Sequence, residues 1–247
     1  MSNFNIIKLN AITSTNNYLK EKLSNATCKD GDLIWTKHQT EGRGQRNKSW
    51  LSEADKSLSL SIYKTFEGKA PQHPFEISSA AACVIIRTLH SVGIPGLNIK
   101  WPNDILSCNH KIGGILIENI YKYSRLNATI IGLGLNINQE KFDSLPHAGS
   151  LFMITQRKWD IETVLNTLIQ NFENVLFSDL LDHKKENLTM FNSFLWRKNK
   201  PSKFYGSEGI FEAIPIEVTL EGNLIISDLE GGLSTINLNQ ARMLYPK

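Results

Sequence analysis

The chain has 247 residues, of which 41% are hydrophobic and 21% are charged, enough for one large domain with a small one beside it. Its net charge of +3 includes no basic tail, which argues against a strong site for duplex nucleic acid. No stretch approaches the roughly 20 apolar residues of a membrane span, no secretory signal is recognisable, and three cysteines without metal-type spacing favour a reducing cytoplasm.

The first part of the chain carries patterns of both helices and strands. Residues 12–16 predict the start of a helix, because hydroxyl side chains that can cap a helix precede apolar residues. Residues 32–37 predict a strand. Residues 57–63 alternate strictly between serine and apolar side chains and give the clearest strand signal. Residues 74–91 predict an apolar helix with proline at its start and glycine just beyond its end.

The second part begins with a predicted hairpin at 100–119 and a strand at 128–138, followed by an amphipathic helix at 160–180. A further helix is predicted at 184–196. After residue 201, short strands alternate with glycine turn signals, a pattern typical of a small β-barrel. At fewer than about 50 residues, such a barrel needs the larger domain for stability.

The order of these elements shows no regular βαβ alternation. We therefore predict an α+β fold with a mixed, mostly antiparallel sheet and interspersed helices, and not a doubly wound nucleotide-binding fold. Two domains are expected, with residues 1–200 forming the main domain and 201–247 the small barrel.

A loop at 39–50 contains three cations within six positions and two glycines. Gly42 and Gly44 can give the backbone positive φ angles, so that N–H groups converge on an anion. Arg43 can grip a phosphate or carboxylate, and Trp50 offers a flat face to a purine or apolar ring. The loop matches neither common phosphate-binding motif, and a solvated surface loop is the alternative.

Charged side chains flank the predicted hairpin. Residues 100–104 read KWPND and residues 111–118 read KIGGILIE, so two lysines and an aspartate lie beside a glycine pair in a run typical of buried strand. Glycines inside a strand often mark close approach of a ligand or another backbone. Together with the loop, this favours one anion held against a sheet; a plain hairpin turning at Asn109 and His110 is the alternative.

A second glycine pair, Gly132 and Gly134, falls on one face of the strand predicted at 128–138. The missing side chains would leave a slot for a flat apolar ligand, and Asn136 on the same face could pair with an amide or adenine edge. A β-bulge or tight packing against a helix would explain the glycines equally well.

These motifs, in this order, resemble the catalytic core of the biotin protein ligases. The resemblance covers residues 14–138 and rests on Ser14-Thr15-Asn16, the loop from Gly42 to Trp50, KWPND, KIGGILIE and the segment Gly132 to Asn136. It implies a class II synthetase-like core with a C-terminal SH3-like barrel. It also implies that ATP, with Mg²⁺, converts biotin to biotinyl-5′-adenylate, and that biotin is then transferred to a lysine of a biotin carboxyl carrier domain.

The resemblance assigns roles to individual residues. The catalytic group is expected to be Lys111, Arg43, Asp104 and Lys48. The biotin site is expected to comprise Ser14, Thr15, Asn16, Gln39, Gly42, Arg43, Gly44, Gln45, Lys111, Gly114, Gly132 and Gly134. ATP and the adenylate are expected to contact Arg43, Arg46, Lys48, Trp50, Asn103, Lys111 and Asn136. No metal ligands are identified, because Mg²⁺ is usually held by phosphates and water.

Two positions depart from the family pattern, with Gln45 where arginine is common and Asn47 where glycine is common. We expect no N-terminal winged helix of the kind that lets some members of the family repress transcription, and therefore expect neither operator binding nor repression. A homodimer is compatible with the sequence. A lipoate-type ligase of related fold and a non-catalytic module that binds biotin or a carrier are the two alternatives.

Overall fold

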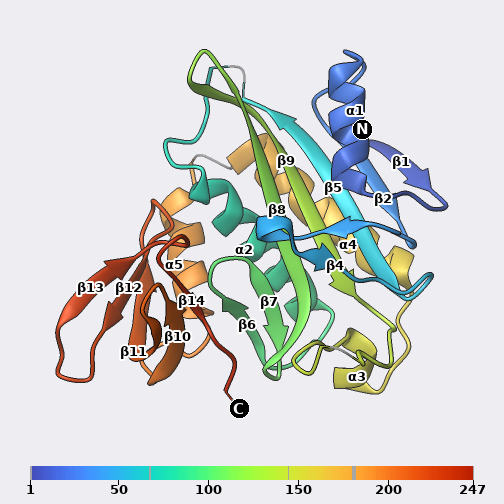
Figure 1. The fold of residues 1–247 in the computed structure, drawn as a ribbon. Helices are drawn as coiled ribbons and strands as arrows, with labels where there is room; N and C mark the ends of the chain where they lie inside the picture. The colour runs from blue at the N-terminus through green and yellow to red at the C-terminus, as the bar shows by residue number, and fades with distance from the viewer. Residues whose placement is uncertain (1, 67, 144, 180–181, 247) are drawn as a thin grey trace.

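The computed structural model describes residues 2–66, 68–143, 145–179 and 182–246, and Figure 1 shows a large sheet with a smaller one beside it. The strands of the large sheet, in spatial order, are β1 (Asn5–Leu9), β2 (Asp32–Thr36), β5 (Ser57–Thr65), β9 (Arg125–Asn136), β8 (His110–Lys122), β7 (Asp104–Ser107) and β6 (Leu97–Lys100). Among the described strands of this sheet, β1 and β2 form the only parallel pair. Strands β6 to β9 are antiparallel neighbours; β6, β7 and β8, and then β8 and β9, are joined by short turns that reverse the chain. The predicted α+β class is confirmed.

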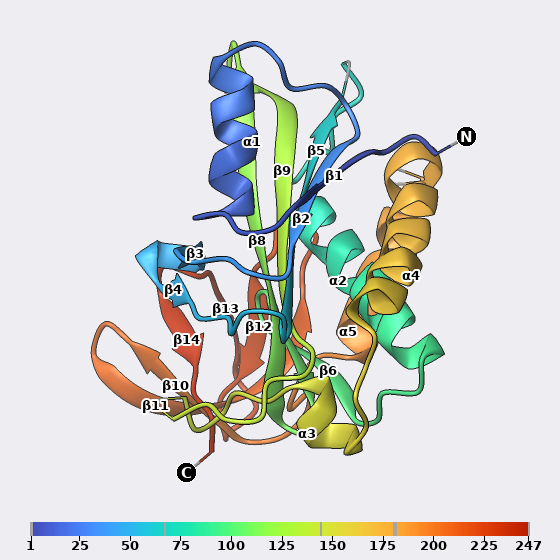
Figure 2. The same ribbon diagram turned by 90° about the vertical axis from the view of Figure 1, so that its right-hand side faces the viewer.

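Helices cover both faces of the large sheet (Figure 2). They are α1 (Thr15–Ser24), α2 (Phe75–Ser91), α3 (Leu151–Thr155), α4 (Ile161–Asn174) and α5 (Lys184–Ser193). Helices α2, α4 and α5 pack together on one face, whereas α1 packs against β2, β5 and β9 on the other. Strand β5 shows the consequence, since Leu58, Leu60 and Ile62 join the core under α2 while its serines are buried toward α1.

The smaller sheet contains five antiparallel strands in the order β13 (Leu233–Ile236), β12 (Leu224–Ser227), β11 (Gly209–Val218), β10 (Ser202–Gly206) and β14 (Ala241–Met243). These strands agree with the small SH3-like barrel predicted from the sequence, although β13 and β14 do not pair to close it within the described residues. The division of the chain at residue 200 stays a prediction.

The small sheet is fastened to the large one beside the KWPND motif. Trp101, which is 1% exposed, donates a hydrogen bond from its indole N–H to the carbonyl of Gly222 at 2.9 Å. Gly222 has a φ of +89° and lies so close to Phe75 that a Cβ would come within 2.7 Å of that ring. The turn after β11 therefore sits against the motif, which fixes the C-terminal strands near it.

Several element ends differ from the sequence-based prediction. The strand predicted at 128–138 is β9, which spans Arg125–Asn136. The helix predicted at 160–180 is α4, followed by a π-helical turn at Val175–Asp179; its last residue, Leu180, lies outside the described residues. The helix predicted at 184–196 is α5, which ends at Ser193. Helix ends fray, and sequence periodicity defines them only to within a few residues.

Four shorter features were also predicted incorrectly or missed. The hairpin turn lies at Cys108 and Asn109, with φ of 48° and 67°, and not at Asn109 and His110. Positive φ at both central residues is the usual geometry of a two-residue hairpin turn. The loop at 39–50 contains a small hairpin of β3 (Gly42–Arg43) and β4 (Ser49–Trp50), and β1 and α3 were not predicted.

Asp32 fixes the start of β2 near the N-terminus. Its fully buried carboxylate accepts hydrogen bonds from the Asn5 amide at 2.8 Å and the Lys29 backbone N–H at 3.1 Å, and it pairs with Lys22 Nζ at 3.0 Å. Burial raises the pKa of this carboxyl, but the hydrogen bonds and the charge of Lys22 outweigh it and hold the pKa below its usual value.

We expect Asp32→Asn to lower the free energy of unfolding by about 3 kcal/mol at pH 7, since it removes the charge of a buried carboxylate and leaves the partly buried Lys22 ammonium unpaired. A carboxyl whose pKa is lowered by folding contributes stability above its unfolded pKa of about 4 and loses it as the pH falls through the folded value. The deficit relative to wild type should therefore shrink in urea unfolding at pH 3. Asp55→Asn, at an exposed position, is the control. An equal deficit at both pH values would contradict the assignment.

Candidate active site

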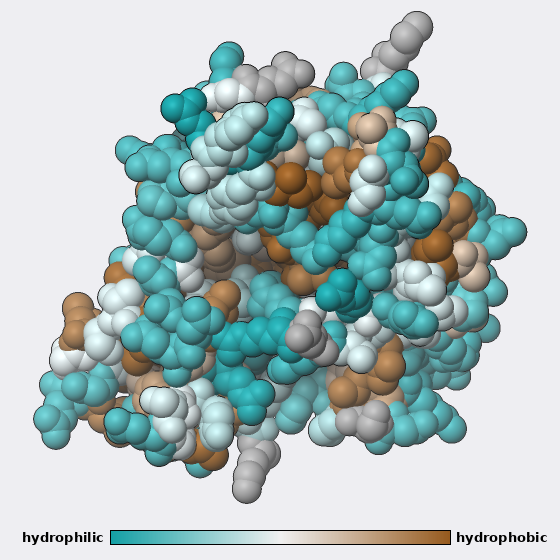
Figure 3. All heavy atoms as spheres, turned by 45° about the horizontal axis from the view of Figure 1, so that its top comes forward, coloured by the Kyte–Doolittle hydropathy of each residue, from teal (hydrophilic) through white to brown (hydrophobic). Residues whose placement is uncertain are grey.

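A cleft of about 680 Å³ lies on the α1 face of the large sheet. It is lined by β8 and β9, the loop that carries β3 and β4, the KWPND turn, Phe142, the segment 145–148 and the C-terminal residues 241–245. Figure 3 shows a hollowed face on which apolar side chains gather around a recess and hydrophilic ones border them. Clefts of this size that combine apolar walls with a few polar groups are typical small-molecule sites.

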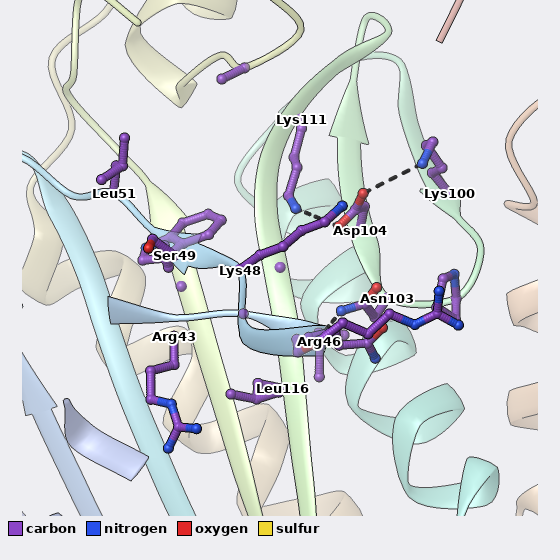
Figure 4. Close-up of a pocket in the computed structure, with 18 of the residues that line it drawn as sticks. Arg43, Arg46, Lys48, Ser49, Leu51, Lys100, Asn103, Asp104, Lys111 and Leu116 are labelled. Atoms are coloured by element: carbon purple, nitrogen blue, oxygen red, sulfur yellow. Dashed lines mark hydrogen bonds and ion pairs between the residues drawn. The ribbon is translucent and has the colours of Figure 1, made fainter. Parts of the chain in front are cut away.

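Three lysines surround one carboxylate in this cleft (Figure 4). Asp104 pairs with Lys111 Nζ at 2.6 Å through one oxygen and lies 3.7 Å from Lys100 Nζ through the other. Figure 4 shows Lys48 extending toward the same carboxylate. Burial lowers the pKa of Lys100, and the charges of Lys111 and Lys48 lower it further against the opposing effect of Asp104. With more cations than carboxylates, this cluster can bind an anion.

Lys100 was recognised from the sequence as one of two lysines flanking the hairpin, but it was given no catalytic or binding role. The side chain of this last residue of β6 is only 10% exposed, and it belongs to the same cluster as the predicted Lys48, Asp104 and Lys111. Its place in KWPND, four residues before Asp104, was the available signal. The β6–β7 turn brings the two side chains together, because Lys100 and Asp104 face each other in the register of the strands.

A glycine slot lies on β8 and β9 and is filled by Trp50, but Gly114 and Gly134 form it and not the predicted pair of Gly132 and Gly134. Gly114 and Gly134 pair directly across β8 and β9. A Cβ on Gly134 would come within 2.4 Å of the Trp50 indole, and one on Gly114 within 3.4 Å. The indole therefore lies flat against backbone that lacks side chains.

For Gly132, the alternative explanation given above is the right one: this glycine allows tight packing against a helix. A Cβ at this position would come within 2.3 Å of the Asn16 carboxamide oxygen on α1. Only Gly114 and Gly134 therefore keep the slot open, whereas Gly132 lets α1 approach the sheet.

Two buried polar groups in the slot have no hydrogen-bond partner. They are the indole N–H of Trp50 and the carboxamide oxygen of Asn136. The Asn136 amide nitrogen donates to the Gly149 carbonyl at 2.9 Å, which orients that oxygen. Since buried polar groups are nearly always paired, an unpaired donor and acceptor in one cleft mark a place for a polar ligand edge.

The N-terminal end of α1 contributes a buried polar network. Ser14 caps the helix by accepting from the Asn17 backbone N–H. Gln39 accepts from the Thr15 backbone at 2.9 Å and from its hydroxyl at 3.2 Å, and Asn16 donates to Glu118 at 2.8 Å. Four predicted residues are thus brought together beside the slot.

Ser61 was not predicted as part of this network. Its hydroxyl lies 2.7 Å from that of Thr15 and 2.5 Å from the Asn16 carboxamide oxygen. The serine face of the alternating strand at 57–63 was its sequence signal, since a polar face that is buried needs polar partners.

Other predicted site residues point elsewhere. Arg43 donates to Asn17 on α1 at 3.1 Å, so its guanidinium does not join Lys111 at the cluster (Figure 4). Arg46 donates to Asn239 at 3.4 Å. Asn103 donates to the Ile115 carbonyl at 2.6 Å, which fastens the KWPND turn to β8. Gln45 lines the cleft, and the side chain of Asn47 lies outside the described residues.

The glycines of the loop do not adopt the predicted positive φ. Gly44 has a φ of −116°, and Arg46 is the residue of this loop in the left-handed region, at 55°. Gly42 is required for close approach instead, because a Cβ there would come within 2.3 Å of the Trp50 carbonyl oxygen and 2.7 Å of the Gln39 amide. The close approach at Gly42 lets the β3–β4 hairpin place Trp50 in the slot.

The fold and the cleft place the chain in a known structural class. The structure is similar to the biotin protein ligase from Aquifex aeolicus in complex with biotin and ATP, with a TM-score of 0.79 over 98% of this chain and 99% of that one, at 23% identity. The fold is thus that of the biotin protein ligases.

Residues 9–136, more than half of the chain, match the model of the biotin/lipoate A/B protein ligase family. The chain belongs to this family. It is 30% identical over 210 residues to the bifunctional ligase/repressor BirA of Escherichia coli, covering 82% of this chain and 63% of that protein. It is 27% identical over 163 residues to the biotin–[acetyl-CoA-carboxylase] ligase of Mycobacterium tuberculosis, covering 65% and 59%. The chain thus spans less than two thirds of the length of these relatives.

Among the described residues, no helix is long and apolar enough to cross a membrane. The same residues contain no group of three or more His, Cys, Asp or Glu side chains placed to hold a metal ion.

Proposed function

We propose that the protein is an ATP-dependent biotin protein ligase. It joins the carboxylate of biotin to the α-phosphate of ATP with release of pyrophosphate, and then transfers biotin from the adenylate to a lysine of a biotin carboxyl carrier domain. The observation that carries this proposal is the cluster of Lys48, Lys100 and Lys111 around Asp104 at the end of an apolar slot.

The first step brings two anions together, because a biotin carboxylate oxygen attacks the α-phosphorus and pyrophosphate leaves. Fixed ammonium groups favour this step by neutralising the charge that builds on the phosphoryl oxygens. Lys111 and Lys48 are assigned to these oxygens, while Arg43 would have to leave Asn17 to reach the phosphates. Mg²⁺ would arrive on the triphosphate and be held mostly by phosphates and water.

The slot on Gly114 and Gly134 is assigned to the biotin rings. Trp50 would leave it on binding and lie against the adenine, which Asn136 reads with its unpaired oxygen. The network of Thr15, Asn16 and Gln39 offers donors and acceptors to the ureido group. Ser14 stays at the helix cap beside it.

In the second step, the neutral ε-amine of the acceptor lysine attacks the acyl carbon of the adenylate. A C–N bond forms, the bond from carbon to the phosphate oxygen breaks, and AMP leaves. The amine must lose a proton in the process. Asp104 is assigned to orient the amine and accept this proton, since its carboxylate lies in the cleft between the two lysines. The acceptor is the carrier domain of a carboxylase; a cytoplasmic location and a homodimer stay predictions.

Exchange of labelled pyrophosphate into ATP tests the proposal. With Mg²⁺, the purified protein should catalyse exchange when biotin is present and not when lipoate or octanoate replaces it. Because the family also includes lipoate ligases, exchange with lipoate alone would establish the alternative activity. Exchange with none of these acids would indicate a non-catalytic binder. Transfer is then followed by mass spectrometry of a carrier domain.

Gln45 provides a separate prediction on the adenylate. We expect Gln45→Arg to slow dissociation of biotinyl-5′-adenylate about three- to ten-fold, because an added cation at the cleft can make a charge-assisted hydrogen bond to the phosphate. The measurement is a chase of bound labelled adenylate with unlabelled biotin. Gln170→Arg adds the same charge at an exposed position on α4, on the other face of the sheet. Equal off-rates for Gln45→Arg and wild type would contradict the prediction.

A further inference from the structure

The C-terminal segment reaches into the lysine–aspartate cluster. The ring of Tyr245 lies over the ammonium of Lys100, with Nζ 4.8 Å from the ring centroid. Strand β14 pairs with β10, and the Leu244 backbone N–H donates to the Lys203 carbonyl at 2.8 Å. The small sheet therefore holds the chain in place up to the residue before Tyr245.

Two aromatic neighbours fix the orientation of the Tyr245 ring. His147 stacks on it with centroids 4.3 Å apart and an interplanar angle of 9°, and Trp196 lies at 5.4 Å and 51°. Trp196 is 2% exposed and donates from its indole N–H to Asn109 at 2.9 Å. The ring that covers Lys100 is thus part of a packed wall and not a loose terminal side chain.

The same wall is connected to the second lysine of the cluster. The backbone carbonyl of His147 accepts a hydrogen bond from the Lys111 backbone N–H at 2.7 Å, and Lys111 returns one through its carbonyl to the Gly149 N–H at 2.9 Å. His147 therefore contacts Tyr245 through its ring and β8 through its backbone.

The contact with the Tyr245 ring matters for Lys100 because the ion pair between Lys100 and Asp104 is long. Its ammonium lies 3.7 Å from Asp104, against 2.6 Å for Lys111, and its side chain is only 10% exposed. A lysine has several rotatable bonds, and ordering it costs free energy that a single long ion pair recovers poorly. An aromatic face close to a desolvated ammonium supplies the missing attraction.

We propose that Tyr245 is a positioning residue, whose ring holds the Lys100 ammonium against Asp104 and so makes the C-terminal segment part of the reaction centre. The role of the ring in placing Lys100 stands on the geometry alone, whereas its effect on the reaction rests on the proposed ligase function. The buried Tyr245 hydroxyl has no hydrogen-bond partner, so the aromatic face and not the hydroxyl carries the role.

The test compares Tyr245→Phe, which keeps the aromatic face, with Tyr245→Leu and Tyr245→Met, which remove it. Limited acetylation followed by mass spectrometry reports how accessible the Lys100 amine is. Pyrophosphate exchange reports kcat and KM. Tyr205→Leu is the matched control, because Tyr205 is an exposed tyrosine of the same small sheet with Arg242 5.1 Å over its ring.

We expect Tyr245→Leu and Tyr245→Met to raise Lys100 acetylation several-fold and to lower kcat for exchange about five- to thirty-fold, with a smaller change in KM. Tyr245→Phe should match wild type in both, and so should Tyr205→Leu. Two variants without the ring guard against one of them failing to fold, which thermal unfolding would reveal.

Unchanged Lys100 acetylation in folded Tyr245→Leu or Tyr245→Met would overturn the proposal, as would a Tyr245→Phe variant that behaves like them. If wild type gives no biotin-dependent exchange, the ligase function fails, and the acetylation result still decides the role of Tyr245. If wild type exchanges normally and every Tyr245 variant equals it in both measurements, Tyr245 has no positioning role and the ligase function stands.

Discussion

Replacing Lys111 with methionine should lower biotin-dependent pyrophosphate exchange about 10²–10³-fold, the usual loss when one fixed group that stabilises transition-state charge is removed. Lys111 makes the shortest ion pair of the cluster, at 2.6 Å to Asp104, and lines the cleft beside Gly114. Methionine keeps the unbranched apolar stem and removes only the ammonium. Without it, Asp104 faces the biotin carboxylate and the α-phosphate with less neutralising charge.

The fold should survive this substitution. The backbone of Lys111 is held by hydrogen bonds to the carbonyl of His147 and from the N–H of Gly149, neither of which uses the side chain. About a third of the side chain is exposed, so the ammonium is not an ion sealed in the core. Urea unfolding of Lys111→Met should therefore lie within about 1 kcal/mol of wild type.

Lys122→Met is the matched control, because it makes the same change at an exposed position of the same strand. It should leave exchange unchanged. Exchange by Lys111→Met within three-fold of wild type would remove Lys111 from the adenylation step and shift attention to Lys48 and Lys100. A large loss of exchange in both variants would indicate a general effect of charge and not a role in the site.

The sequence alone was informative wherever a contact is local or a pattern is strong. The alternation at 57–63, the helix at 74–91 and the hairpin at 100–119 all appear as elements of the fold. The slot predicted from Gly132 and Gly134 was only half right, because Gly114 on the neighbouring strand, and not Gly132, lies beside Gly134 on the bare face.

Contacts between distant parts of the chain could not be predicted in the same way. Tyr245 reaches Lys100 because Trp101 and Gly222 fasten the small sheet beside the KWPND turn and β14 carries the end of the chain to the cluster. Trp50 fills the slot because β3 and β4 form a hairpin too short to be recognised from periodicity. Composition identified the cationic loop but not the direction in which Arg43 points, since an exposed side chain takes its direction from its neighbours.

Replacing Gly134 with valine should weaken biotin binding about 100-fold. Gly134 has an extended backbone that tolerates a side chain, and valine favours strands, so β9 should keep its structure. The obstacle to biotin is the valine side chain, which would occupy the bare face of β9 where the biotin rings are proposed to lie. A ring on this face comes very close to the backbone, as Trp50 shows, since a Cβ would lie 2.4 Å from its indole. Overpacking costs about 1–3 kcal/mol, and each 1.4 kcal/mol is a factor of ten in affinity.

Titration calorimetry with biotin measures this loss, and Gly134→Ala should give a smaller one in proportion to its single methyl group. Asn127→Val places the same side chain at an exposed position of β9 and should bind biotin like wild type. Because Trp50 can move off the slot with its hairpin, the unfolding free energy of Gly134→Val should fall by less than its binding free energy. Unaltered biotin binding by Gly134→Val would place the biotin rings elsewhere in the cleft. The Trp50 indole on Gly134 would then be a permanent wall of the site and not a group that the ligand displaces.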